Sequence, residues 1–230
     1  MTTREFVVQP EPGPHLPWQK FPRFYVRRNS CLYRAVRNGR GPWWFCTCGK
    51  CRFDLSKPRG TCYLSSDPLC GLLECIGIEW CTRENEAVFE ISFLQQWLIH
   101  VLHVETRIRL ANLTHRRALQ FRITNELSDM SQYRVPRLYA RTFDETRGNR
   151  GATVFDGIRY RTRFDTGPRP NGVALFGGEG ERPWSSTTKP VDDQIIGQLR
   201  LLGIHIEEPP PITALEVDDG ENLLDQAKIS

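Results

Sequence analysis

The residues best suited to chemistry lie in one block of the chain, residues 32–77. Arg34, Arg52, Tyr63 and Glu74 follow one another there. An arginine guanidinium binds phosphate or carboxylate oxygens through its planar fork, and an aromatic ring supports a flat ligand ring. A carboxylate can stabilise positive charge that develops in a transition state. These four side chains are therefore the candidates for binding and catalysis.

Glu74 has two interpretations. It stands among Leu72, Leu73 and Ile76, and a carboxylate in apolar surroundings costs free energy unless something binds it or it takes part in chemistry. The alternative is a partly exposed helix residue that pairs with an arginine. The spacing alone supports both interpretations equally.

The cysteines form a second group with possible chemistry. Cys46, Cys48 and Cys51 lie in a Cys-x-Cys-Gly-Lys-Cys stretch, and Cys62 follows. Closely spaced thiolates can hold zinc, but structural zinc sites commonly pair two Cys-x-x-Cys knuckles. This stretch has one such knuckle and an offset partner. We therefore predict no metal and reduced thiols, with zinc at Cys46, Cys48, Cys51 and Cys62 as the alternative.

The elements that must position these residues form a mixed pattern. A polar residue followed by proline is a typical helix start, so Asp67 and Pro68 predict that Glu74 lies on a helix directly after the strand that carries Tyr63. Strands are predicted at residues 24–26, 31–33, 60–64, 98–104, 107–110, 158–163, 173–176 and 204–206, and helices at 68–76, 114–120 and 194–202. Residues 90–96 fit either type. Strands and helices do not alternate regularly, which favours an α+β fold.

The chain divides into three predicted parts. Residues 1–22 contain five prolines and indicate an extended arm that does not form a packed element. Residues 23–206 form the domain, since the 230-residue length suits one large domain. Residues 207–230 are proline-rich and then mostly acidic, which is typical of a solvated, mobile tail.

Composition excludes several classes of protein. No stretch approaches the ~20 apolar residues of a membrane span, and the N-terminal residues lack the apolar core of a signal peptide. We therefore expect a cytoplasmic protein without a membrane partner. The net charge is +4, and the basic residues are mainly arginines. An arginine-rich surface, the aromatic residues 43–45 and a zinc knuckle would together suit a nucleic-acid-binding module, but that alternative leaves the order of Arg34, Arg52, Tyr63 and Glu74 unexplained.

The order of the motifs resembles the RES-domain family, which is named for arginine, glutamate and serine positions. The matching stretches are Tyr-Arg at 33–34, Arg-Phe-Asp at 52–54, Gly-Thr-Cys-Tyr-Leu at 60–64, Asp-Pro at 67–68, Leu-Leu-Glu at 72–74, the block 155–165 and residues 173–177. The resemblance covers residues 30–180. The arm, the cysteine cluster and the tail lie outside it.

The resemblance implies a fold like that of the ADP-ribosyltransferases and an enzyme that degrades NAD, an NAD glycohydrolase or an NAD phosphorylase. It implies water or inorganic phosphate as acceptor, no cofactor, and an antitoxin protein as partner. Arg34 and Arg52 would bind the pyrophosphate, Tyr63 would line the nicotinamide pocket, and Glu74 would be catalytic together with Arg34. Cleavage of the nicotinamide–ribose bond passes through an oxocarbenium-like transition state, as in glycoside hydrolysis, which a carboxylate stabilises.

The family's serine has no clear counterpart. Its Tyr-x-Ser-Arg stretch corresponds to residues 160–163, where Thr162 stands in the serine position and keeps a hydroxyl. We expect Thr162 to complete the catalytic set, with the region 128–131 before Tyr133 as the other source of a hydroxyl. The threonine leaves open a third alternative, an inactive RES scaffold that only binds partners.

Overall fold

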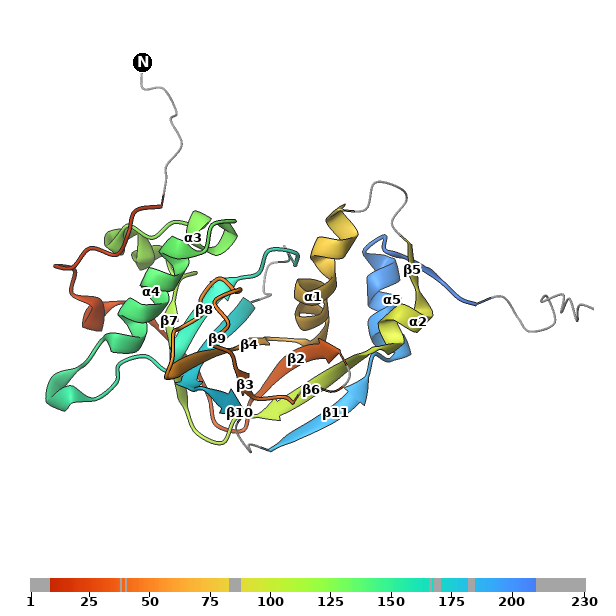
Figure 1. The fold of residues 1–230 in the computed structure, drawn as a ribbon, viewed down its shortest axis with the longest axis horizontal. Helices are drawn as coiled ribbons and strands as arrows, with labels where there is room; N and C mark the ends of the chain where they lie inside the picture. The colour runs from red at the N-terminus through yellow and green to blue at the C-terminus, as the bar shows by residue number, and fades with distance from the viewer. Residues whose placement is uncertain are drawn as a thin grey trace, which may run out of the picture.

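The computed structural model of the chain describes residues 9–37, 39, 41–82, 88–165, 167, 171–181 and 185–209. These residues form a large mixed sheet with short helices, drawn in Figure 1. The strand order is β1-β7-β8-β9-β4-β2-β6-β11. All neighbouring strands are antiparallel except β7 and β8, which are parallel. The predicted α+β class is confirmed.

The strands of the large sheet are β1 (Arg23–Val26), β2 (Cys31–Arg37), β4 (Arg59–Ser65), β6 (Trp97–His103), β7 (Ile108–Asn112), β8 (Gly157–Arg161), β9 (Asn171–Gly178) and β11 (Ser186–Pro190). Two small sheets pair β3 (Trp44–Phe45) with β10 (Gly180–Glu181), and β5 (Val88–Glu90) with β12 (His205–Glu207). The helices are α1 (Pro68–Thr82), α2 (Ile91–Gln95), α3 (Glu126–Asp129), α4 (Arg134–Glu145) and α5 (Asp193–Leu201). Short 3-10 turns occupy Trp18–Lys20, Arg116–Phe121 and Asn149–Gly151.

Each predicted strand and helix has a counterpart among these elements. Residues 90–96, which fitted either type, divide between β5 and α2. The sequence prediction missed α4, which begins with Pro136 in its first turn, where a missing N–H is tolerated. Its buried positions, Pro136, Tyr139, Ala140 and Phe143, follow the three- and four-residue spacing of an amphipathic helix.

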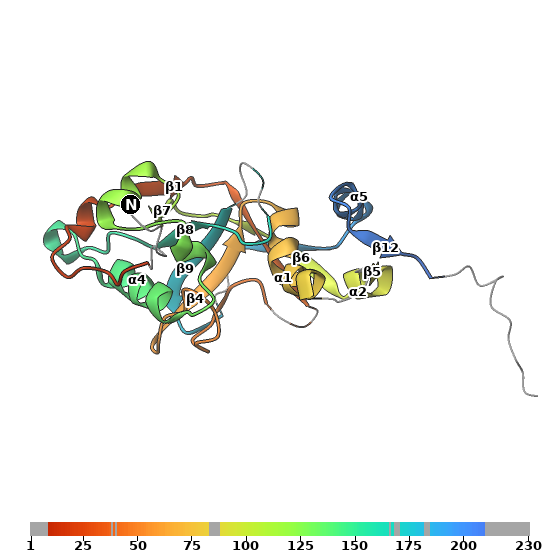
Figure 2. The same cartoon turned by 90° about the horizontal axis from the view of Figure 1, so that it is seen from above.

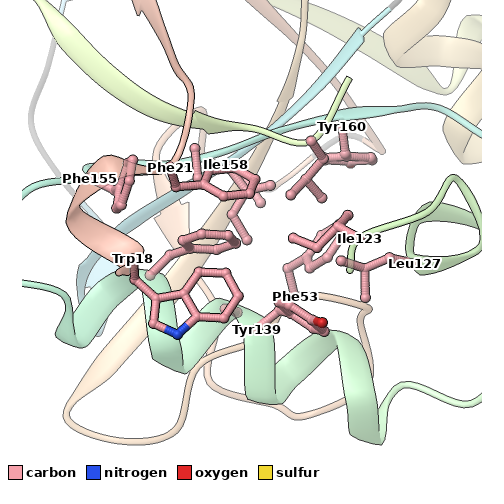
Figure 3. Packing of buried hydrophobic residues seen from close by; sticks show 14 of the residues in the cluster. Trp18, Phe21, Phe53, Ile123, Leu127, Tyr139, Phe155, Ile158 and Tyr160 are labelled. Atoms are coloured by element: carbon pink, nitrogen blue, oxygen red, sulfur yellow. The ribbon is translucent and has the colours of Figure 1, made fainter. Parts of the chain in front are cut away.

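Helices cover one face of the sheet in two groups, which the second view separates (Figure 2). The first core cluster lies between α4 and the half of the sheet that contains β8 and β9, and Figure 3 shows its packing around Trp18, Phe53 and Tyr160. The second core cluster joins α1, α2 and α5 to β2 and β6. The third core cluster lies on the opposite face, where Trp43 and Phe45 pack against Cys62 and Leu64.

The two halves of the sheet meet at a narrow point. Strands β2 and β4 share one register pair, Tyr33 with Ser65. Helix α1 sits directly on this junction, since a Cβ at Gly71 would lie 2.7 Å from Ser65 Oγ and 3.6 Å from the Ala35 nitrogen. Glycine is therefore required at position 71 for the close approach of helix and sheet.

The N-terminal segment differs from its prediction. Gln9 is 1% exposed, and its side-chain amide donates to Arg122 O at 2.8 Å and to the Tyr139 hydroxyl at 3.1 Å. Trp18 and Phe21 are buried in the first core cluster. The prediction of an arm apart from the packed domain is therefore corrected for residues 9–22: aromatic side chains among the prolines anchor this segment.

The predicted acidic tail falls mostly outside the described residues, which end at position 209. Within them, Glu207 ends β12 and Glu208 pairs with Arg200 at 2.9 Å. Among the described helices, none has the length and the apolar character that crossing a bilayer requires.

Candidate functional site

The site is built around the start of α1. Asp67 Oδ1 accepts from the Cys70 N–H at 2.8 Å, which satisfies one of the unpaired donors at the helix start. Ser65 Oγ donates to Tyr33 O at 3.1 Å and lies 2.7 Å from Asp67 O. These contacts fix the turn between β4 and α1. They determine where α1 carries Glu74.

Glu74 is half-buried and holds the loop that follows β8. Its Oε1 accepts from the backbone N–H of Arg163 at 2.7 Å and of Phe164 at 2.9 Å. The Phe164 ring packs against Gly77, where a Cβ would lie 2.3 Å from the ring. No ion pair and no hydrogen bond to Oε2 is found for Glu74 within the described residues. Among the described residues, the carboxylate is thus held through one oxygen and makes no pair with an arginine side chain.

Thr162 lies in the same loop and is buried. Its hydroxyl lies 3.0 Å from Asp165 O, and the Cys70 thiol lies 3.8 Å from Thr162 Oγ1. The contact between the Thr162 hydroxyl and Asp165 O closes a turn. This turn explains why β8 ends at Arg161, whereas the sequence predicted a strand that continues to residue 163. Burial raises the pKa of the Asp165 carboxyl, and the Gly167 N–H opposes that effect.

A hollow of about 430 Å³ opens beside this loop, and we call it the α3 hollow. Its lining includes Asn125, Asp129, Arg161, Thr162, Arg163 and Asp165. Arg163 Nη2 donates to Asp129 O at 3.1 Å and to Met130 O at 3.2 Å, which ties the loop to α3. Ser128, the other candidate for the family's hydroxyl, is buried in α3 next to Asp129, and Ser131 is exposed.

Arg52 is a buried cation with an unpaired donor. It is 9% exposed, and its Nε has no hydrogen-bond partner within the described residues. The guanidinium carbon lies 5.9 Å from the Tyr133 ring centre and 6.0 Å from the Tyr160 ring centre. Two aromatic rings therefore flank the guanidinium, which stabilises a cation by cation–π attraction but leaves the N–H unsatisfied.

Tyr63 and Tyr160 are two tyrosines of this region whose pKa values are raised. The Tyr63 hydroxyl donates to Asp54 Oδ1 at 2.9 Å and accepts from the Phe53 N–H at 2.8 Å. Burial, and next the Asp54 carboxylate, raise the pKa of Tyr63 well above its usual value. Burial also raises the pKa of Tyr160, which the charge of Glu74 raises further and that of Arg52 lowers. Tyr160 is thus a buried, neutral phenol beside the Arg52 guanidinium.

Arg34 points away from this group. Residues on a strand alternate between faces: Tyr33 and Ala35 pack with α1 in the second core cluster, whereas Leu32 belongs to the third. Arg34 Nη1 donates to Pro42 O at 3.0 Å and to Cys62 Sγ at 3.4 Å. The structure thus brings Arg52, Tyr63, Glu74 and Thr162 to one face of the sheet and directs Arg34 to the other.

The cysteine cluster also divides between faces. Cys46 forms a backbone β-bridge with Thr61, so the side chains of these two residues lie on the same side of the sheet. On that side, Thr61 Oγ1 donates to Phe53 O. Cys62 faces the third core cluster. The predicted alternative set of Cys46, Cys48, Cys51 and Cys62 is therefore not brought together. No disulfide joins the eight cysteines, all of which lie in the described ranges.

Sequence reasoning missed several residues of this region. Asp54 stood in the Arg-Phe-Asp motif and Tyr160 in the later motif block, but neither had an assigned role. Tyr133 comes just before the missed helix α4. Their contacts join segments that are far apart in the chain, so spacing within one segment gave no signal. Only the occurrence of Asp54 and Tyr160 inside the resemblance motifs could have marked them.

Comparison with known proteins shows the fold and no family. No protein-family model matches the chain, and no curated protein matches it in sequence. A chain of the crystal structure of the M. tuberculosis MbcT–MbcA toxin–antitoxin complex is similar in structure, with a TM-score of 0.53 and 13% sequence identity. The match covers 77% of this chain and 92% of that chain. At this identity the likeness establishes a shared fold, and the resemblance to the RES-domain family stays a prediction.

Proposed function

We propose that the protein cleaves the bond between nicotinamide and ribose in NAD, with water or inorganic phosphate as acceptor. The observation that carries the proposal is the buried Arg52, whose Nε has no acceptor within the described residues, on the same face of the sheet as the Glu74 carboxylate. The order of the RES-like motifs supports NAD as the substrate. The fold shared with a chain of a toxin–antitoxin complex supports a role as the toxin of such a pair.

Arg52 is suited to the pyrophosphate. A buried N–H without an acceptor costs free energy, and the Arg52 Nε is such a donor. A phosphate oxygen would accept from it and would neutralise the guanidinium. In the proposed complex, the rings of Tyr133 and Tyr160 keep this cation in place while Tyr63 lines the nicotinamide side.

Glu74 is suited to the reacting ribose. The N–H groups of Arg163 and Phe164 hold Oε1, which fixes the direction of Oε2. As the bond from the ribose carbon to the nicotinamide nitrogen breaks, its electron pair leaves with nicotinamide and the ribose becomes oxocarbenium-like. The fixed carboxylate stabilises this charge, and an oxygen of water or phosphate then forms the new bond on that carbon.

Thr162 and Arg34 have narrower roles in the proposal. Thr162 Oγ1 donates to Asp165 O and accepts from the Cys70 thiol, and its second lone pair would accept from a ribose hydroxyl. Arg34 uses Nη1 for Pro42 O and Cys62 Sγ, and no hydrogen bond of its Nη2 or Nε occurs within the described residues. We assign Arg34 a structural role, because it points to the opposite face of the sheet from Arg52 and Glu74 and does not reach the same substrate. No cofactor takes part in these steps.

The direct test is incubation of the purified full-length chain with NAD, with and without inorganic phosphate. We expect release of nicotinamide together with ADP-ribose, or with its 1-phosphate when phosphate is the acceptor. Arg52→Ala should raise the KM for NAD, because the pyrophosphate is charged before and during the reaction. Arg200→Ala, which removes an exposed ion pair with Glu208, should leave kcat and KM for NAD unchanged. A folded protein that leaves NAD intact for hours would exclude the activity and favour the inactive scaffold.

A further inference from the structure

The geometry points to a zinc site formed by Cys46, Cys48, Cys51 and Asp54, in the segment between β3 and β4. This ligand set differs from the one that spacing suggested, because Asp54 takes the place of Cys62. The inference depends on the geometry of this segment and does not require the proposed activity on NAD. It revises the sequence prediction that this cluster holds no metal.

Three of the four ligand atoms already lie at the separations that a single ion needs. The sulfurs of Cys46 and Cys48 and a carboxylate oxygen of Asp54 are all within 4.8 Å of one another. The Cys48 sulfur is 3.5 Å from Asp54 Oδ2. A tetrahedral zinc ion with bonds of about 2.3 Å to sulfur and about 2.0 Å to oxygen separates its ligands by roughly 3.5–3.8 Å. Only small side-chain movements separate this arrangement from a closed site.

Cys51 supplies the fourth position. Its backbone N–H donates to Asp54 Oδ2 at 2.9 Å, whereas its sulfur lies outside the group of atoms within 4.8 Å of one another and has to move to close the site. Gly49, between these cysteines, has a φ of +65°, a left-handed conformation that glycine adopts without strain. This tight turn connects Cys48 to the backbone N–H of Cys51, which binds the same Asp54 carboxylate as the Cys48 thiol.

Asp54 is a buried carboxylate that no cationic side chain pairs with among the described residues. The residue is 3% exposed, and within the described part of the chain it forms no salt bridge. Its oxygens accept from the Tyr63 hydroxyl, the Cys51 N–H and the Cys48 thiol. A buried carboxylate is stabilised by a paired cation or a metal ion. Arg137, a nearby cation, instead donates to the carbonyls of Cys51 and Gly49.

The offset spacing no longer argues against zinc once the sheet is considered. Cys46 and Cys62 lie on neighbouring segments but face opposite sides of the sheet. Asp54 lies on the same side as Cys46, and an aspartate oxygen is an accepted zinc ligand. A metal here would have no open position for substrate, so its role would be structural. It would fix the segment that holds Arg52, and it would fix Asp54, which binds the Tyr63 hydroxyl.

The test measures metal content directly on the full-length chain without a histidine tag, prepared under reducing conditions with zinc. We expect one zinc per chain by elemental analysis. Replacement by cobalt(II) should give the intense visible bands of a tetrahedral site and thiolate-to-cobalt charge-transfer absorption. Neither readout depends on NAD, so failure of the proposed enzyme activity and failure of the metal site are distinguishable.

Variants separate the ligand set from its alternatives. Cys48→Ser and Asp54→Asn should lose at least nine-tenths of the bound metal, whereas Asp54→Cys should retain it, which distinguishes loss of a ligand from loss of the fold. Cys81→Ser, at an exposed cysteine outside the cluster, should keep full occupancy, and so should Cys62→Ala. A reduced wild-type chain that takes up neither zinc nor cobalt overturns the site. Retention by Asp54→Asn together with loss in Cys62→Ala overturns the assignment of the fourth ligand.

Discussion

At the scale of single residues, Glu74 combines a structural contact and a proposed catalytic one. Its Oε1 accepts two backbone N–H groups from the loop after β8, and its Oε2 is left for a substrate. Substitution by alanine would remove both contacts and could not separate them. Glutamine can, since its carbonyl oxygen keeps the acceptor while the negative charge is lost.

We predict that Glu74→Gln lowers kcat for NAD cleavage about a hundredfold, which corresponds to about 2.7 kcal/mol of transition-state stabilisation. The KM should change little, because the charge acts only when the oxocarbenium character develops. The melting temperature should stay close to that of the wild type. Steady-state kinetics and thermal unfolding on the same sample check both parts. Near-normal turnover in this variant would remove Glu74 from the catalytic set.

The sequence was informative at this scale where a motif stayed within one element. Tyr63 on a strand and Glu74 on the helix that follows it were placed correctly, because Asp67 and Pro68 mark the helix start. The side to which Arg34 points could not be read in the same way. It depends on how β2 joins β4 at Tyr33 and Ser65, and a short strand buried on both faces has no polar alternation to reveal its orientation.

At the scale of elements, the main omission from the sequence prediction was α4 together with the segment that packs on it. Pro136 obscured the helix, and five prolines obscured the packing role of residues 9–22. Trp18 and Phe21 nevertheless meet Tyr139 and Phe143 of α4 in close ring contacts, such as 5.9 Å between the centres of Trp18 and Tyr139. Such contacts depend on tertiary structure, so local composition does not predict them.

We expect Phe21→Ala to destabilise the protein by about 3–5 kcal/mol, the usual cost of removing a buried aromatic ring. Phe21 is 1% exposed and contacts the rings of Phe121 and Phe143 at 4.9 Å between centres. Leu119→Ala, at a residue that is 69% exposed, serves as the control and should change stability little. Urea unfolding of the three proteins measures the difference. Equal midpoints for Phe21→Ala and wild type would restore the description of residues 9–22 as an unpacked arm.

At the scale of the whole molecule, tyrosine hydroxyls and cysteine thiols with raised pKa values lie over both halves of the sheet. Burial raises the pKa of the Tyr139 hydroxyl, in the first core cluster, to about 12. Burial likewise raises the pKa of the Cys70 thiol to about 12 and that of Cys75 to about 11, both on α1. In the unfolded chain these groups titrate near their ordinary values, about 10 for tyrosine and about 8.5–9 for cysteine.

This difference predicts a loss of stability at alkaline pH. A raised pKa in the folded state favours the neutral form, so its contribution is fully present below the unfolded pKa and is lost as pH rises through the folded one. The free energy of unfolding should therefore fall between about pH 9 and pH 12. Urea titrations across this range measure the slope, and Tyr139→Phe should reduce it above pH 10. A free energy of unfolding that stays constant up to pH 12 would contradict the assignment.

The burial of Trp18 and Phe21 has a consequence for synthesis of the chain. Their core cluster also contains Ala174 and Phe176 of β9, so these early aromatic side chains have no complete binding place until about 150 further residues have been made. At typical elongation rates that delay is on the order of 10–30 s. During this time two large apolar side chains near the N-terminus stay accessible to chaperones and proteases. A nascent or truncated chain that ends before β9 is therefore expected to remain protease-sensitive along its N-terminal segment.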